Sequence, residues 1–237
     1  SMSVRSQEIL KELRLTPLWR YRVKDPVNIL AKTPSSSVTK KEDRGSQILR
    51  SDWVQLEENV VGCTSCSLFQ DRTKTVFGAG DKNADWLFIG DVPRTEEDTQ
   101  GEPLIGLSGE LLDNMLEAVS LKRGDNIYIT NTVKCRPSGD RNPYNSEEQQ
   151  CEPFLIRQIE LIKPKLIIVL GEIAAQNLLG TSATIDSLRG RLHEYSSIPL
   201  IVTYHPAYLL QIQSDKEKVW QDLCFARNIM QKELKDS

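Results

Sequence analysis

The chain has 237 residues, of which 39% are hydrophobic and 27% are charged. This composition excludes a fibre, a fully disordered protein and a disulfide-stapled miniature, and the length suits one substantial core with an appendage. Lys and Arg number 30 against 33 Asp and Glu, so the net charge of −3 does not attract nucleic acid to the surface as a whole. No run approaches the ~18 apolar residues that span a bilayer, and the first residues lack a secretory apolar run, so we expect a cytoplasmic protein.

The first 50 residues are expected to form an arm and a tether. Residues 25–50 are rich in Pro, Ser, Thr and Lys, which predicts a flexible linker because such a segment buries too little apolar surface to offset its ordering entropy. Residues 1–24 carry a short apolar stripe that predicts a partner-binding peptide, the alternative being a helix packed on the main domain. The residues expected to bind the partner are Leu10, Leu13, Leu15, Leu18 and Trp19.

From residue 51 to residue 237, short apolar runs alternate with amphipathic segments of helical length. The expected strands are 86–90, 126–132, 165–170 and 199–203, and the expected helices are 109–120, 146–162, 172–179 and 215–234. This alternation predicts an α/β fold, a three-layer α/β/α sandwich around a four-stranded parallel sheet, with the N-terminal peptide as an arm.

Polar residues stand where the expected strands end. Asp91 follows the first strand, Asn131 lies at the end of the second, and His205 follows the fourth. Because ligands bind beyond the carboxyl ends of strands in open α/β sheets, a carboxylate, an amide and an imidazole are expected at one edge. Strand-end polar residues also form turns, so their position alone leaves that alternative open.

Five cysteines in a chain without an export signal favour metal ligation or buried thiols over a disulfide framework. Cys63 and Cys66 form a C-x-x-C, and Cys135 and Cys151 lie far downstream. Four thiolates from two remote parts of the chain suit either tetrahedral zinc or a four-iron, four-sulfur cluster. Spacing alone does not choose between them, although the lack of a second C-x-x-C favours iron and sulfur. Cys224 is expected in the core.

Several motifs follow one another along residues 51–230. They are Cys63-x-x-Cys66, GDVPRTEEDTQGEPLIGLSGELLD from residue 90, TNTVKCRP from residue 130, Cys151, LRGR from residue 188 and YHPAYLL from residue 204. Together they resemble the family 4 uracil-DNA glycosylases, the iron-sulfur branch of that superfamily. The resemblance implies a [4Fe-4S] cluster on Cys63, Cys66, Cys135 and Cys151, and an enzyme that flips uracil out of DNA.

The resemblance also assigns roles to single residues. Asn131 matches the amide that recognises the uracil edge, and His205 matches the imidazole that hydrogen-bonds the uracil oxygen as it gains negative charge. Asp91 stands where a glutamate usually positions water. Arg189 and Arg191 match the region that approaches the DNA backbone.

The expected base pocket departs from the family pattern. It keeps Gly90 and Pro93. Asp91 is one methylene shorter than the usual Glu, Arg94 replaces a Gly, and Leu104 replaces the aromatic platform that stacks on uracil. Misplacing a water-positioning group by about 1 Å can cost ~10²-fold in rate, and a lost stacking face costs ~1–3 kcal/mol. These changes predict an inactive or weakened site.

A second resemblance concerns the N-terminal segment. Leu10-x-x-Leu13-x-Leu15-Thr16, followed by Trp19-Arg20, is similar to the start of the psi subunit of bacterial DNA polymerase III, and residues 219–223 are similar to another part of it. This resemblance implies the clamp loader and the chi subunit as partners.

Two functions therefore compete. We favour a psi-like accessory subunit of the polymerase III clamp-loader complex, built on an iron-sulfur glycosylase fold whose pocket has degenerated. The net charge of −3 and the acidic run at 96–98 favour it, because proteins that search DNA gain affinity by neutralising phosphates. The alternative is an active family 4 type uracil-DNA glycosylase that hydrolyses the uracil N-glycosidic bond in base excision repair. Asn131 and His205 favour that alternative.

Overall fold

A computed structural model describes residues 43–236, which lie in the second of two compact units, residues 42–237. The predicted peptide arm at 1–24 and most of the predicted linker lie outside the described residues. So do the residues expected to bind a partner, Leu10, Leu13, Leu15, Leu18 and Trp19.

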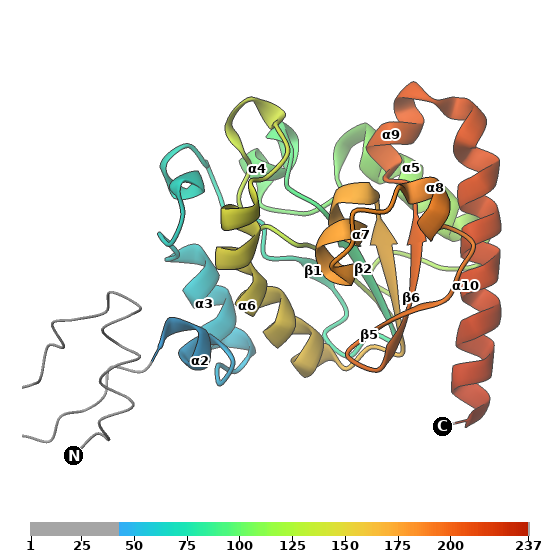
Figure 1. Ribbon diagram of the computed structural model, residues 1–237, viewed down its shortest axis with the longest axis horizontal. Coiled ribbons are helices and arrows are strands. Elements are labelled where there is room, and N and C mark those ends of the chain that lie inside the picture. The colour runs from blue at the N-terminus through green and yellow to red at the C-terminus, as the bar shows by residue number, and fades with distance from the viewer. Residues whose placement is uncertain (1–42, 237) are drawn as a thin grey trace, which may run out of the picture. The chain divides into compact units, whose positions relative to one another are not determined.

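A mixed sheet of six strands forms the centre of this unit (Figure 1). In sequence order the strands are β1 (Ala79–Gly80), β2 (Trp86–Gly90), β3 (Ile127–Asn131), β4 (Leu166–Leu170), β5 (His193–Tyr195) and β6 (Ile198–Thr203). Their spatial order is β1-β3-β2-β4-β6-β5, and the inner four are parallel to one another. The prediction of an α/β fold is confirmed, and its four parallel strands are these inner four.

The sheet has two more strands than the sequence predicted. β1 and β5 pair antiparallel with the outer parallel strands and are two and three residues long. Runs this short carry no recognisable alternation of apolar and polar residues, which is why the sequence pattern missed them.

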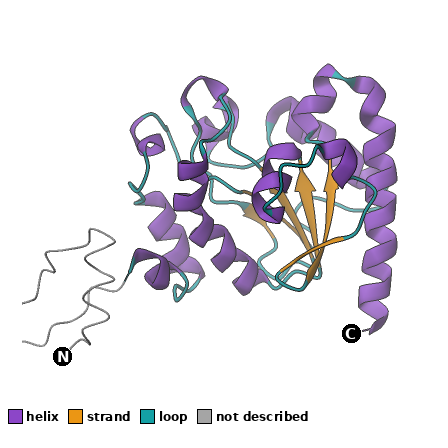
Figure 2. Cartoon of the chain, in the orientation of Figure 1, coloured by secondary structure: helices purple, strands orange, loops and turns teal. Residues whose placement is uncertain are grey.

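Helices cover both faces of the sheet (Figure 2). The α-helices are α2 (Arg44–Ile48), α3 (Trp53–Val61), α4 (Thr95–Gln100), α5 (Gly106–Ala118), α6 (Asn145–Ile162), α7 (Glu172–Leu179), α8 (Ile185–Leu188), α9 (Pro206–Gln211) and α10 (Lys216–Asp236). Short 3₁₀ turns are η1 (Ser67–Gln70), η2 (Ser138–Asp140) and η3 (Gln213–Asp215). Within residues 43–236, no helix is long and apolar enough to cross a membrane.

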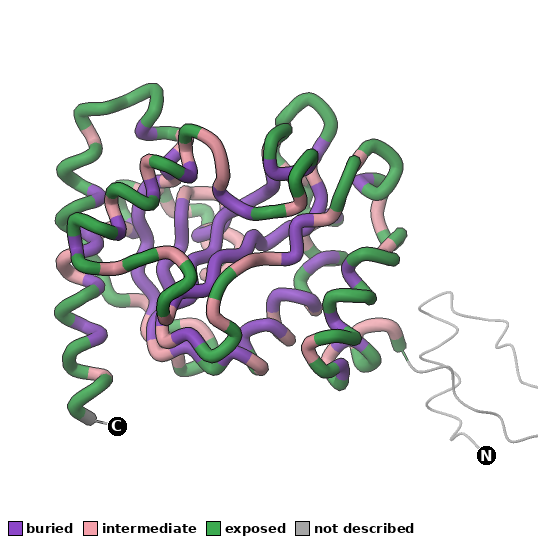
Figure 3. Tube along the Cα trace, turned by 180° about the vertical axis from the view of Figure 1, so that it is seen from behind, coloured by how far each residue is buried: buried purple, intermediate pink, exposed green. Residues whose placement is uncertain are grey.

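β2, β3 and β4 are buried along their whole length, and alternate side chains of β2 and β4 pack into the cores on opposite faces of the sheet. Phe88 and Ile168 pack with α5, α9 and α10, whereas Leu87 and Ile167 pack with α6, α7 and α8. Figure 3 shows this buried centre between helices whose outer sides are exposed. Near-continuous apolar strands are expected where helices cover both sides of a parallel sheet.

The predicted linker does not extend to residue 50. Ile48, on α2, is 3% exposed and belongs to a third core cluster that includes residues of α3 and α6. Asp52 begins α3 by accepting a hydrogen bond from the backbone N–H of Gln55 at 2.9 Å. The packed body therefore includes residues 44–50, where the composition had indicated a tether.

The chain reverses its direction of travel across the sheet between β2 and β4. From β2 it crosses to β3 on one side, and from β4 it crosses to β6 on the other. In doubly wound sheets this point opens a crevice at the carboxyl ends of the strands. Gly90 pairs with Asn131 at the ends of β2 and β3, so the predicted site residues meet beside that crevice.

Candidate functional site

A cavity of about 410 Å³ opens at the carboxyl edge of the sheet. We call it the strand-end cavity. Its walls come from the segments that follow β2, β4 and β6, and they include Asp91, Arg94, Gly171, Tyr204, His205 and Tyr208. The switch point in strand order therefore holds two of the predicted site residues in one cavity wall.

Asn131 carries an amide with no partner. Its Nδ2 and Oδ1 atoms are both buried, and neither has a hydrogen-bond partner among the residues that the structure describes. Leaving such groups unpaired costs about 1–3 kcal/mol each, so folded proteins rarely do so without a ligand to satisfy them. The amide can accept one hydrogen bond and donate another to a bound molecule.

Gly90 makes room beside that amide. A Cβ atom at Gly90 would lie 2.5 Å from Asn131 Oδ1 and 3.5 Å from His205 Nε2. A side chain there would therefore collide with the amide, and the space between these groups exists because residue 90 is a glycine.

His205 begins α9, and its ring has a defined orientation. Its Nδ1 accepts a hydrogen bond from the backbone N–H of Ala207 at 3.0 Å. Burial lowers the pKa of His205, against the opposing effect of the Asp91 carboxylate. A neutral ring whose Nδ1 accepts must carry its proton on Nε2, so His205 presents an N–H donor beside Gly90.

Asp91 follows β2 and is held on both carboxylate oxygens. Oδ1 accepts from the backbone N–H of Val92 at 2.7 Å and lies 3.9 Å from His205 Nε2. Oδ2 pairs with Arg94 Nη2 at 3.2 Å. The carboxylate and the imidazole predicted to share a site therefore do so.

Pro93 and Leu104 do not line the strand-end cavity. Pro93 is buried in the segment between β2 and α4. Leu104 is 1% exposed and packs in the core with residues of α5 and α10. Its backbone is left-handed, with φ at 49°, and its N–H donates to Glu97 Oε1 at 2.5 Å. Contact of either side chain with a base stays a prediction.

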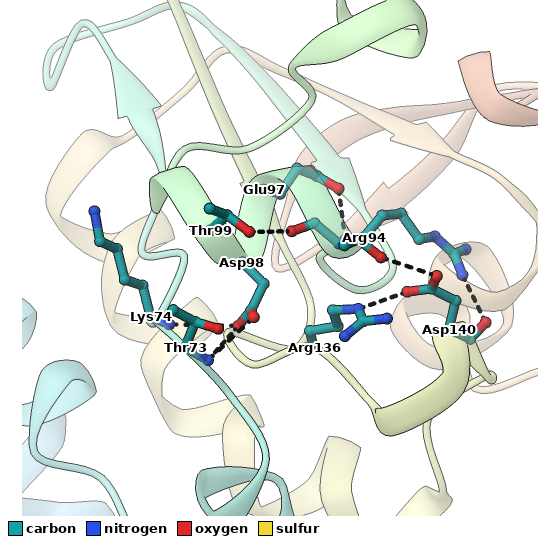
Figure 4. A network of polar contacts seen from close by, with 9 residues as sticks. Thr73, Lys74, Arg94, Glu97, Asp98, Thr99, Arg136 and Asp140 are labelled. Atoms are coloured by element: carbon teal, nitrogen blue, oxygen red, sulfur yellow. Dashed lines mark hydrogen bonds and ion pairs between the residues drawn. The ribbon is translucent and has the colours of Figure 1, made fainter.

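The acidic run at 96–98 is not the repulsive surface that the sequence indicated. Glu97 and Asp98 are 5% and 3% exposed, and only Glu96 faces solvent. Glu97 Oε2 accepts from the Arg94 N–H at 2.7 Å, and Asp98 accepts from the Thr73 N–H at 2.9 Å (Figure 4). Because two of the three carboxylates serve the fold, the run is weak evidence against DNA binding.

The two arginines expected at the DNA backbone differ in their surroundings. Arg189 forms a two-point ion pair with Asp222, at 2.8 and 3.1 Å, and its guanidinium lies 4.9 Å from the Tyr204 ring centre. Arg191 is exposed. Arg189 thus has a structural task that the sequence did not reveal, since Asp222 lies 33 residues away along the chain.

A second cavity, the cysteine cavity, brings together four thiols from distant segments. Its volume is only about 10 Å³, and its lining includes Cys63, Cys66, Cys135 and Cys151. Cys63 follows α3, Cys66 precedes η1, Cys135 follows β3, and Cys151 lies within α6. Cys224, on α10, packs against the core cluster on the other side of the sheet.

Donors that the sequence did not predict surround these sulfur atoms. Arg72 Nη1 lies 3.1 Å from the Sγ atom of Cys135, and Arg44 Nη2 lies 3.4 Å from that of Cys63. Burial raises the pKa of the Cys151 thiol to about 12. A buried thiol of this kind becomes a thiolate when a metal replaces its proton. The donor set therefore fits a thiolate-bound group, although no group of three or more Cys, His, Asp or Glu within residues 43–236 is arranged to hold a metal ion.

Comparison with known proteins identifies the family. Residues 77–224 match the model of the uracil DNA glycosylase superfamily. The type-4 uracil-DNA glycosylase of Archaeoglobus fulgidus is 37% identical over 180 residues, which cover 70% of this chain and 89% of that protein. The type-4 uracil-DNA glycosylase of Thermotoga maritima is 36% identical over 182 residues, which cover 75% of this chain and 94% of that protein.

These relatives overturn one prediction. Five type-4 uracil-DNA glycosylases match at 34–37% identity, so the prediction of a psi-like polymerase subunit with a degenerate pocket is wrong. The clamp loader and the chi subunit, expected as partners on the same resemblance, remain untested. The family-model match and the identity to the type-4 relatives show that the chain belongs to the type-4 uracil-DNA glycosylases of the uracil DNA glycosylase superfamily.

Proposed function

We propose that this protein hydrolyses the N-glycosidic bond between uracil and deoxyribose in DNA. The observation that carries the proposal is the unpaired, buried amide of Asn131 beside Gly90 and His205. Uracil offers an imide N–H donor next to a carbonyl acceptor, and one asparagine amide complements both. The type-4 glycosylase relatives support the same activity.

Each residue has one task in the proposed reaction. The flipped base enters beside Gly90, because a base within the DNA stack is out of reach. Asn131 binds the imide edge, and the Nε2–H of His205 donates to the uracil oxygen that gains negative charge. Asp91 orients a water molecule toward C1′ and accepts its proton.

The bond changes balance. The water oxygen bonds to C1′ while the C1′–N1 bond breaks, and the electron pair of that bond leaves on uracil as an anion. The products are uracil and an abasic sugar in the DNA strand. Selectivity follows from the amide, because a base with an amino group at the same edge presents a donor where the site offers one.

We further propose that Cys63, Cys66, Cys135 and Cys151 hold a [4Fe-4S] cluster. Four cysteines around one cavity, with Arg44 and Arg72 donating toward the sulfur atoms of Cys63 and Cys135, support an anionic thiolate-bound group, and the resemblance to the iron-sulfur branch of the family favours a cluster over zinc. When bound, the cluster supplies a covalent cross-link among segments that are remote in sequence, and its role here is structural.

Uracil release from DNA tests the proposed activity. The purified holoprotein is incubated with single- and double-stranded oligonucleotides that contain one uracil, and strand scission at the abasic site is measured after alkali. Wild type should cleave both, whereas Asn131→Asp should lose roughly 10³-fold or more, because the substitution replaces a donor by an acceptor.

Asn59→Asp is the matched control. Asn59 is an exposed asparagine on α3, remote from the strand-end residues in sequence, and its amide donates to Ser51 Oγ at 3.0 Å. It should cleave at the wild-type rate. No uracil release by folded, cluster-loaded wild type contradicts the proposal.

A further inference from the structure

Arg94 is the residue of the strand-end cavity that the family pattern does not account for. Its side chain is 33% exposed and forms part of the cavity wall beside Asp91. The pattern has a glycine at this place, and a long cation there was expected to obstruct the base. The contacts of the guanidinium indicate a different role.

The guanidinium joins the Asp91 carboxylate to a neighbouring loop. Nη2 pairs with Asp91 Oδ2 at 3.2 Å, and Nη1 donates to the backbone carbonyl of Asp140 at 3.1 Å. Asp91 Oδ1 accepts from the Val92 N–H at 2.7 Å. Each oxygen of the carboxylate thus has one fixed donor, and each keeps lone pairs that can face the cavity.

The other end of this link is firmly held. The Asp140 carboxylate accepts from Arg136 Nε at 2.7 Å and from Thr95 Oγ1 at 3.2 Å. The backbone N–H of Arg94 donates to Glu97 Oε2 at 2.7 Å. Figure 4 shows these contacts joining the start of α4 to the loop that holds Asp140. Arg94 is therefore anchored at its backbone and at its side chain.

We propose that Arg94 is a positioning residue that fixes the carboxylate of Asp91 for its work on water. The inference rests on the proposed function. An aspartate is one methylene shorter than the glutamate of the family pattern, and in this chain a guanidinium anchored on Asp140 sets the direction of the shorter side chain. Arg94 acts through Asp91 and does not touch the reacting atoms.

Two Arg94 variants and a matched arginine control test the role. Arg94→Gln removes both guanidinium contacts, and Arg94→Lys keeps the charge but reaches one partner at a time. Arg157→Gln is the control, because Arg157 also pairs with a carboxylate three residues away, Glu160 at 2.9 Å, and also donates to a backbone carbonyl at 2.8 Å.

Two quantities are measured on the holoprotein. One is the single-turnover rate of uracil release from a single-stranded oligonucleotide with enzyme in saturating excess. The other is the Kd for the same oligonucleotide carrying 2′-fluoro-2′-deoxyuridine, which resists hydrolysis, at several salt concentrations. Arg94→Gln should lower the rate by roughly 10- to 100-fold with Kd within about twofold of wild type, since a displaced catalytic group costs rate and not binding.

Arg94→Lys should recover part of that rate, and Arg157→Gln should match wild type in both measurements. A crystal structure of Arg94→Gln should show the Asp91 carboxylate in a changed rotamer.

Three results would overturn the inference. The first is uracil release by Arg94→Gln at the wild-type rate. The second is an Asp91 rotamer in Arg94→Gln that is the same as in wild type. The third is weaker DNA binding by Arg94→Gln, with a salt slope lower by about one and an unchanged single-turnover rate. This result would show that Arg94 contacts the DNA backbone instead. If wild type releases no uracil, the proposed function itself fails, and that outcome is distinct from an active wild type beside an equally active Arg94→Gln.

Discussion

The cysteine cavity and the strand-end cavity differ in how their polar atoms are satisfied. Around the thiols of Cys63 and Cys135, arginine side chains already lie within 3.4 and 3.1 Å of the sulfur atoms. In the strand-end region, the Asn131 amide has no partner among the described residues. Cationic donors around sulfur atoms suit an anionic group that stays bound. An unpaired amide suits a neutral ligand that binds reversibly. The residue types alone do not distinguish the two cavities. The hydrogen-bond donors around the thiols and around the amide do.

Replacing one thiol should have the largest effect. Cys135→Ser removes one of the four proposed cluster ligands, so the visible absorption expected of anaerobically purified protein should be lost, and the loop after β3 should become sensitive to protease. Cys224→Ser is the matched control, because Cys224 packs on the opposite side of the sheet and should leave the spectrum unchanged. Wild-type protein that contains zinc and no iron would contradict the cluster.

The structural role of Arg189 can be separated from the DNA contact expected of Arg191. Arg189→Ala leaves the Asp222 carboxylate, 3% exposed, without its ion pair, and should lower the free energy of unfolding by about 3 kcal/mol. Arg191→Ala removes an exposed cation and should leave stability unchanged while reducing the salt slope of DNA binding by about one. Urea denaturation and anisotropy titrations measure the two effects. Equal stability of both variants would show that the Arg189 pair does not support the fold.

Replacement of Glu97, which accepts from two backbone N–H groups, should have a smaller effect on stability. Glu97→Gln keeps the size of the side chain but points an amide N–H₂ at a backbone donor, either the Arg94 N–H or the Leu104 N–H. Two buried donors that face each other should lower the free energy of unfolding by about 1–3 kcal/mol, measured by urea denaturation. Glu96→Gln, at the exposed neighbour, should cost less than about 0.5 kcal/mol. A Glu97→Gln protein as stable as wild type would show that the hydrogen bonds of Glu97 to the Arg94 and Leu104 N–H groups do not support the fold.

The smallest expected effect is on pH dependence. Burial lowers the pKa of His205 below the ordinary 6.5, while Asp91 opposes and Arg94 reinforces the shift. The native state therefore binds fewer protons than the unfolded state, and the stability from neutral His205 is present above pH 6.5 and is lost as pH falls toward the folded pKa. Wild type should lose stability relative to His205→Gln on acidification below pH 6.5, and single-turnover excision should stay constant through pH 6.5. A wild-type rate that halves at that pH would place the pKa at its ordinary value.

Much of the fold was predictable because its signals are local. The strand at 86–90 and the helix at 172–179 have the bounds that apolar runs and periodicity predicted. The meeting of Asp91, Asn131 and His205 at one edge also followed, since the carboxyl ends of parallel strands share an edge. The four cysteines were predicted together from residue type and resemblance.

The errors arose where a residue's partner is distant in sequence. The sequence predicted an acidic surface at Glu97 and Asp98. Nothing in the sequence near them indicates that their carboxylates accept hydrogen bonds from the backbone N–H groups of Leu104 and Thr73. That reading favoured a binding subunit over an enzyme. The contact between Arg94 and the carbonyl of Asp140 could not be predicted either, because nothing in the sequence connects the two residues.

The glycine at the end of β2 has a practical consequence. An added methyl group at Gly90 would come within 2.5 Å of Asn131 Oδ1, so either the amide or the strand end must move. We expect alanine at this position to displace the Asn131 amide and abolish the proposed uracil release, while it retains every surface charge and every cysteine. Cells that carry it would reveal whether the phenotype of a gene deletion comes from missing chemistry or from a missing protein.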